Sequence, residues 1–286
     1  MQWIGRRGSG NVEDGRSGGG FGGFGGGRLG IVGLLVVLAI SFFTGQNPLQ
    51  LLSQVQSNGP AASQVASGPP AEADSAARFV SVVLADTEEI WGKLFAERGQ
   101  TYAPPKLRLF RGQVQSGCGG ATDATGPFYC PADQRIYIDL SFYDDLHRKY
   151  GAPGDFAMAY VIAHEVGHHI QHLLGTTRLA DEARARGTDA GPTGASVRLE
   201  LQADYYAGVW AHYEEHLLGV LDPGDVQEAM QAAAAVGDDR LQQQAQGQVV
   251  PDAFTHGTSA QRQRWFMQGY QSGDPAGGDT FGSKAL

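Results

Sequence analysis

The chain has 286 residues and a formal net charge of −9, and apolar residues make up 42% of it. A chain of this length and composition can bury a sizeable core, so wholesale disorder is excluded. The acidic balance argues against nucleic-acid binding, which needs a basic surface.

Residues 1–28 are rich in glycine and contain the run GGGFGGFGGG, which predicts a flexible tail. Residues 29–43 then read LGIVGLLVVLAISFF and carry no charge. With its flanks, the segment 29–45 reaches the lower end of the length that crosses a bilayer. A buried core helix is the alternative. The arginines before this segment predict a single-pass signal anchor, with a cytoplasmic N-terminus and the remaining chain in the periplasm or outside the cell.

Residues 46–73 are rich in Gln, Ser, Ala and Pro and lack hydrophobic periodicity, so we expect a stalk. The folded domain is expected over residues 74–272, followed by a disordered tail at 273–286. Asp74 can cap a helix that ends near Arg98. The segments 106–110 (KLRLF) and 135–140 (RIYIDL) are typical of strands, and the Gly-rich stretch around residue 118 is typical of a loop.

Four further helices are expected in the second half of the chain. They cover about 155–174, about 196–218, an Ala-rich stretch after Asp222, and the residues after Thr258, whose hydroxyl can form a capping box with Gln261. Residues 176–195 are polar and Gly-rich, so we expect an irregular connection there. The pattern as a whole predicts an α+β domain that is mainly helical with a small sheet.

Cys118 and Cys130 are the two cysteines of the chain. Two cysteines are too few for a zinc site built from four thiolates. They predict a single disulfide bond if the domain is exported to an oxidising compartment, and two free thiols if it is not.

The segment AHEVGHHIQ carries the chemistry that the sequence predicts most clearly. His164 and His168 are four residues apart, so on a helix both imidazoles leave the same face and can bind one metal ion. Glu165 can then act on a water molecule at that metal. Gly167, between the two histidines, permits the close approach of another helix.

A catalytic zinc site with two histidines needs a third protein ligand. The second long helix offers ELQAD, in which Glu200 and Asp204 share one face. We expect Glu200 to bind the metal and Asp204 to accept a hydrogen bond from the distal N–H of a ligating histidine. An ordinary acidic helix face is the alternative.

A second motif, HYEEH at residues 212–216, has the inverted H-x-x-E-H order of another class of zinc peptidases. A site at this motif would need its own downstream acidic ligand, for which Glu228 is the glutamate left. The motif itself has surroundings typical of the solvated end of a helix. We therefore favour the first motif. His147, His169 and His172 are expected at the surface or beside the metal ligands.

These stretches resemble the bacterial neutral zinc metallopeptidases, a membrane-anchored family with a gluzincin-like pattern. The similarity covers roughly residues 74–272 and is strongest in four segments: CGGATDATGPFYCPADQRIYIDLSFYDDL, HEVGHHIQ, RLELQADYYAGVW and FTHGTSAQRQRWF. The resemblance implies a zincin-like fold, one zinc ion per chain and a peptide or unfolded protein as substrate.

The resemblance also implies residue roles. Glu165 would be the general base, and His256 corresponds to a late histidine that stabilises the oxyanion, with Tyr205 and Tyr206 as weaker candidates. The substrate would pair with an edge strand above the zinc helix, for which we expect the segment Ile136, Tyr137, Ile138, Asp139 and Leu140. Two alternatives are a membrane-tethered scaffold or chaperone-like module with little proteolysis, and a structural metal-binding protein. Cleavage specificity and oligomeric state stay open.

Overall fold

The computed structural model describes residues 1–16, 66–67 and 74–286. Its compact unit consists of Met1–Gly15 and Ala66–Leu286. The predicted anchor at 29–45 lies outside the described residues, as does the predicted stalk apart from residues 66–67. Within the described part of the chain, no helix combines the length and the apolar character needed to cross a membrane.

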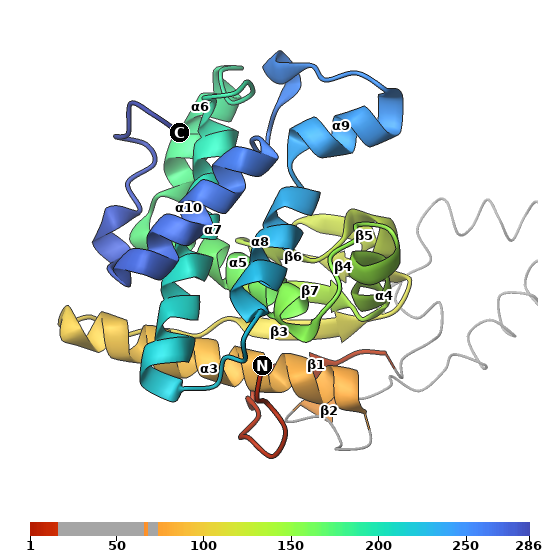
Figure 1. The fold of residues 1–286 in the computed structure, drawn as a ribbon, viewed down its shortest axis with the longest axis vertical. Coiled ribbons are helices and arrows are strands. Elements are labelled where there is room, and N and C mark those ends of the chain that lie inside the picture. The colour runs from red at the N-terminus through yellow and green to blue at the C-terminus, as the bar shows by residue number, and fades with distance from the viewer. Residues whose placement is uncertain (17–65, 68–73) are drawn as a thin grey trace, which may run out of the picture. The chain divides into compact units, whose positions relative to one another are not determined.

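The main sheet has five strands in the order β2-β1-β3-β7-β6 (Figure 1). The bounds are Val12–Asp14 for β1, Ala66–Ser67 for β2, Lys106–Phe110 for β3, Phe128–Cys130 for β6 and Arg135–Asp139 for β7. Strands β1, β3 and β7 run parallel, and β2 and β6 are antiparallel at the two edges. The predicted α+β class and both predicted strands are confirmed.

Residues 1–16 belong to the folded domain, so the predicted flexible tail is wrong for this part of residues 1–28. Strand β1 pairs with β3, and Val12 is fully buried. The Arg6 guanidinium lies 2.6 Å from an Asp86 carboxylate oxygen, and Trp3 packs edge-on against Phe79. A strand that is hydrogen bonded to β3 must lie on the same side of any membrane as the domain. This pairing does not fit the expected arrangement with the N-terminus in the cytoplasm and the domain outside.

The longer helices pack against one another. Their bounds are Ser75–Glu97 for α3, Asp155–Leu174 for α5, Ala195–Tyr213 for α7, Asp225–Ala235 for α8 and Ser259–Ser272 for α10. Asp74 caps α3, and Thr258 and Gln261 form the predicted capping box of α10. In Figure 1, α7 and α10 lie side by side, with α5 and α8 next to them. The five predicted helices are confirmed.

Shorter elements occupy segments that were expected to be irregular. The stretch around residue 118 is a hairpin of β4 (Gln113–Ser116) and β5 (Gly119–Thr122), and α6 (Thr177–Ala185) lies within the predicted polar connection. The helices α4 (Ser141–Arg148) and α9 (Asp238–Gln246) were not predicted. The predicted disulfide is present and joins Cys118, in the hairpin, to Cys130 at the end of β6.

Glycines let α7 lie close to the helices on its two sides. A Cβ atom on Gly167 would lie 2.9 Å from the Ala203 carbonyl oxygen, so α5 and α7 approach closely at this point. On the other side, a Cβ on Gly208 would lie 2.0 Å from the Phe266 carbonyl oxygen of α10. Both contacts exclude larger residues and bring the polar side chains of α5, α7 and α10 together.

The predicted disordered tail at 273–286 is also wrong, because this segment packs against α7. Thr280 is fully buried and donates a hydrogen bond to the Arg198 carbonyl oxygen at 2.6 Å. The Arg198 guanidinium in turn donates to the carbonyl oxygens of Thr280 and Ser283. Backbone carbonyl groups of the tail therefore form hydrogen bonds with Arg198 of α7 where they would otherwise bind water.

Candidate metal centre and active site

Three predicted ligands converge where α5 meets α7. Nε2 of His164 lies 3.2 Å from Oε2 of Glu200, and Nε2 of His168 lies 3.5 Å from Oε1 of the same carboxylate. One ligand atom from each of these residues lies within 4.8 Å of the others. Two imidazole nitrogens and a carboxylate are a common donor set for catalytic zinc. The residues therefore fit a zinc ion.

The outer nitrogen of each histidine is engaged by an acceptor. Nδ1 of His164 lies 2.8 Å from Oδ1 of Asp204, as predicted, and Nδ1 of His168 lies 2.9 Å from Oε1 of Gln171. When Nδ1 donates to an oxygen, Nε2 keeps its lone pair for a metal. Both imidazoles thus present Nε2 to the space beside Glu200.

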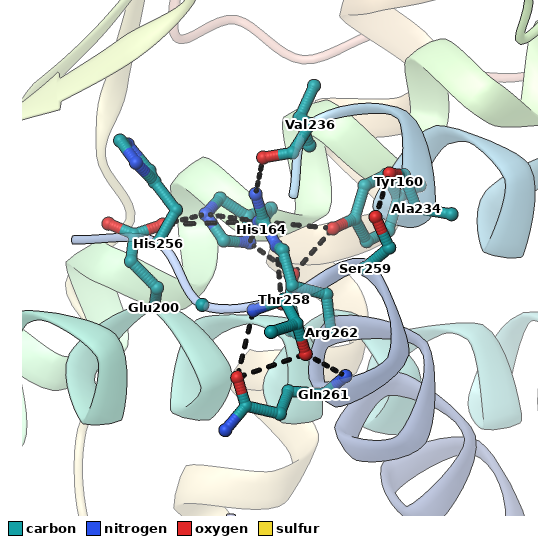
Figure 2. A network of polar contacts seen from close by, with 12 residues as sticks. Tyr160, His164, Glu200, Ala234, Val236, His256, Thr258, Ser259, Gln261 and Arg262 are labelled. Carbon is teal, nitrogen blue, oxygen red and sulfur yellow. Dashed lines mark hydrogen bonds and ion pairs between the residues drawn. The ribbon is translucent and has the colours of Figure 1, made fainter. Parts of the chain in front are cut away.

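Arg262, on α10, completes the group around Asp204, and sequence reasoning missed it. Figure 2 shows Arg262 beside Tyr160 and His164. The Nε and Nη2 atoms of Arg262 donate to the two Asp204 oxygens at 2.8 and 2.9 Å, and the Tyr160 hydroxyl donates to Oδ1. Burial alone would raise the pKa of Asp204, but the charges of Arg262 and His164 hold it below its usual range. Asp204 therefore stays an acceptor for His164.

Glu165 lies in the same cleft as the three ligands. Only 7% of the residue is exposed. Burial raises the pKa of its carboxyl to about 7, and the Glu200 charge acts in the same direction. A carboxylate with a pKa near neutrality is suited to accept and then return a proton.

His256 also lines this cleft, and its side chain is 49% exposed. Asp238, at the start of α9, accepts hydrogen bonds from the backbone N–H groups of Thr255, His256 and Gly257. Its other oxygen lies 3.1 Å from Nδ1 of His256. This hydrogen bond raises the pKa of the imidazole and holds it by one nitrogen, leaving the other available to the cleft.

The predicted substrate strand is wrong. Strand β7 pairs with β3 on one side and with β6 on the other, so Ile136, Tyr137, Ile138 and Asp139 have no free edge, and Leu140 lies beyond the strand. Within the described residues, β6 is the edge strand on this side of the sheet. Phe128 and Tyr129 of β6 line the cleft, whose volume is 580 Å³.

Other candidates lie away from the metal ligands. The Tyr205 hydroxyl bonds to Ser272 and to the Asp274 carbonyl, and Tyr206 packs against Trp91, so neither tyrosine lines the cleft. His147 is exposed and His172 is half-buried, as expected of residues outside the ligand set. His169 is fully buried, hydrogen bonded to the Tyr129 hydroxyl and the Ala103 carbonyl oxygen. It ties α5 to β6.

The inverted motif at residues 212–216 does not form a metal site in the part of the chain that the structure describes. His212 contacts the Tyr270 carbonyl oxygen, and His216 contacts that of His212. Glu228, the acid that such a site would need, accepts a hydrogen bond from the Phe156 backbone at the start of α5.

A family model described as "Putative neutral zinc metallopeptidase" matches residues 1–281. The chain belongs to this family. The match includes residues 1–16, in agreement with the place of β1 in the sheet. A family described as zinc metallopeptidases also agrees with the donor set of His164, His168 and Glu200.

Similar proteins occur in Escherichia coli and in mycobacteria. Uncharacterized protein YpfJ of Escherichia coli is 51% identical over 285 residues, which is 99% of each chain. Uncharacterized protein Rv2575 of Mycobacterium tuberculosis and Uncharacterized protein Mb2605 of Mycobacterium bovis are each 49% identical over 195 residues, or 65% of each chain. No solved structure matches the chain.

Proposed function

We propose that this member of the zinc metallopeptidase family hydrolyses peptide bonds, with Glu165 as the general base. One observation carries the proposal. The buried Glu165 carboxylate, with its pKa near 7, shares one cleft with the two histidines and Glu200. A site that only holds a metal does not need a further carboxylate beside its two histidines and Glu200.

The residues divide the work as follows. Zinc, when bound, supplies a Lewis acid that polarises a carbonyl and makes water more acidic. Glu165 removes a proton from the attacking water and later delivers it to the leaving amine. His256 is held through Nδ1 by Asp238, which favours the imidazolium, and in that form its Nε2–H donates a hydrogen bond to the oxyanion as it develops.

We further propose that the substrate lies along β6 in a zincin-like arrangement. An extended peptide can pair with the backbone of an exposed edge strand, which orients its carbonyl groups. The side chains of Phe128 and Tyr129 line the same cleft as Glu165. A peptide paired with β6 would therefore pass beside the base and the metal ligands.

Zinc content and hydrolysis of casein, measured on the same preparation, test the proposal. We expect about one zinc per chain and hydrolysis that stops when the metal is chelated and returns when zinc is added. Zinc binding without hydrolysis would instead support a scaffold or a structural metal protein. Absence of zinc binding would contradict the whole proposal.

We also propose that the domain acts outside the cytoplasm. The Cys118–Cys130 disulfide supports this location, since such bonds persist mainly in oxidising compartments. In that case strand β1 lies outside the cytoplasm with the rest of the sheet. Attachment to a membrane through residues 29–45 stays a prediction.

A further inference from the structure

A continuous line of hydrogen bonds leads from His168 to the segment that follows α10. Oε1 of Gln171 lies 2.9 Å from Nδ1 of His168. Nε2 of Gln171 donates to Oε1 of Gln202 at 3.1 Å, and Nε2 of Gln202 donates to the Gly278 carbonyl oxygen at 2.6 Å. The line starts on α5, crosses α7 and ends in residues 277–283.

The line ends at the Gly278 carbonyl oxygen, and this acceptor fixes the direction of every hydrogen bond in the line. A backbone carbonyl can only accept, so Gln202 must present its NH₂ group to Gly278 and its oxygen to Gln171. Gln171 then presents its NH₂ group to Gln202 and its oxygen to His168. His168 must therefore carry its proton on Nδ1, which leaves the Nε2 lone pair facing Glu200.

Burial makes this order difficult to reverse. Gln171 is fully buried, and Gln202 is 5% exposed. The second N–H of Gln171 donates to the Leu199 carbonyl oxygen at 2.6 Å, so both of its N–H groups are used. If the Gln202 amide were reversed, two NH₂ groups would face each other without water to satisfy them, which is costly in a protein interior.

The Gly278 carbonyl oxygen is held in place by close packing. A Cβ atom on Gly278 would lie 2.9 Å from Cδ1 of Tyr205 and 3.2 Å from Cε1 of Tyr206, so glycine lets the backbone lie flat on the two rings. Hydrogen bonds between Arg198 and Thr280 fix the residues that follow. The acceptor at the end of the line is thus part of a rigid contact with α7.

We propose that Gln171, Gln202 and the segment 277–283 are positioning elements that set the tautomer and orientation of the metal ligand His168. This inference rests on the proposed zinc peptidase function, because it assigns the elements a purpose at that metal. The segment acts on the ligand only through the two glutamine side chains. A merely structural role would affect folding without a specific effect on His168.

Zinc affinity of the full chain, measured by competition with a chromophoric chelator, tests the proposal. Methionine is close to glutamine in length and cannot form these bonds, so the variants are Gln171→Met, Gln202→Met and both together. Gln171→Met should raise the Kd for zinc about 10–100-fold, as expected for loss of a partner behind a ligand. Gln202→Met should raise it about tenfold, and the double variant should resemble Gln171→Met alone.

Gln243→Met is the matched control. Gln243 is exposed on α9 and also donates through Nε2 to a carbonyl oxygen, that of Gly247. Its substitution should leave the Kd for zinc unchanged. If Gln202→Met does not fold, Gly278→Ala tests the same link from the other end, because the added Cβ must displace the carbonyl from Gln202.

¹⁵N NMR of histidine-labelled, zinc-free protein reads the tautomer directly. The native chain should show His168 protonated on Nδ1, and Gln171→Met, which removes the acceptor of that proton, should show a mixture of both tautomers. A Kd for zinc within twofold of the native value in Gln202→Met, or additive effects in the double variant, would overturn the proposal. If the native chain bound no zinc, the proposed function would fail, whereas the tautomer measurement would still test the line of hydrogen bonds from His168 to Gly278.

Discussion

Arg262 and Asp204 form a buried, bidentate ion pair between α10 and α7, with N–O distances of 2.8 and 2.9 Å. The Arg262 side chain is 4% exposed and that of Asp204 is fully buried. The pair satisfies a carboxylate that would otherwise be costly to bury, and the same carboxylate orients His164. The packing of α10 on α7 and the geometry of the proposed zinc site therefore depend on one pair.

Arg262→Met should destabilise the fold because it leaves the Asp204 charge buried without its partner. We expect the free energy of unfolding, measured in urea, to fall by about 3–5 kcal/mol. Arg264→Met, at an exposed position on the same helix, should change it by less than about 0.5 kcal/mol. Equal effects of the two substitutions would show that the ion pair does not hold α10 to α7.

Glu165→Gln should separate metal binding from chemistry. The amide keeps the shape of the side chain but cannot accept the proton of the attacking water. We expect zinc content to stay near that of the native chain while casein hydrolysis falls about 10²–10⁴-fold. Full activity in this variant would remove Glu165 as the base.

His256→Ala should lower kcat about 10²–10³-fold without changing zinc content, because it removes a donor to the oxyanion. Asp238→Asn should cause a smaller loss of activity, since it weakens the hydrogen bond that holds Nδ1 of His256. Steady-state kinetics on a defined peptide separate kcat from KM. A change confined to KM would place His256 in substrate binding only.

Replacing both cysteines by serine should lower stability and disturb the cleft. Closing a loop of this length contributes about 3 kcal/mol through the entropy of the unfolded chain. Because Cys130 ends β6, we also expect weaker substrate binding, seen as a higher KM. A reductant should lower the melting temperature of the native chain and leave that of the variant unchanged, which serves as the control.

The contribution of a buried carboxyl pair, Asp86 and Glu214, to stability should fall as pH rises towards 7. Burial raises the pKa of Asp86 to about 7 against the opposing charge of Arg6, and burial raises that of Glu214 well above its usual value. Between about pH 4 and 7 the folded state keeps a proton that the unfolded state releases. Each such proton lowers the free energy of unfolding by roughly 1.4 kcal/mol per pH unit until the folded pKa is passed.

Glu214→Gln should therefore flatten the pH dependence of stability in zinc-free protein. Glu214 is fully buried, and neither of its carboxylate oxygens has a hydrogen-bond partner. Glu215→Gln, at a neighbouring position whose side chain is 46% exposed, is the control and should follow the native curve. Urea unfolding at pH 5, 6, 7 and 8 gives the comparison, and parallel curves for all three proteins would contradict this assignment.

Helical periodicity allowed the ligand set to be predicted from the sequence. Residues four apart share a helix face, so His164 and His168 converge once α5 forms, and Glu200 and Asp204 follow the same rule on α7. Gly167, between the histidines, marks the point where α7 approaches. The spacing of these residues is local, and for that reason it can be read without knowledge of the fold.

The missed residues depend on contacts that are distant in sequence. The edge position of β6 follows from which strands pair, and a segment as short as FYC gives no periodic signal. Strand β1 is hidden because residues 1–16 precede a run of glycines that dominates the composition. Arg262 did leave a signal, since it shares a face of α10 with Trp265, Phe266 and Gly269, and a charge on an apolar face needs a buried partner.

The pairing of β1 with β2 has a consequence for protein engineering. Asp14 lies opposite Ala66 in an antiparallel register, so the chain leaves and re-enters the domain at adjacent positions of one sheet. Residues 15–65 are thus an insertion with neighbouring ends, and a short turn could close the gap at little cost in loop entropy. A chain shortened in this way should fold and keep the proposed zinc ligands, giving a compact form of the protein suited to crystallisation.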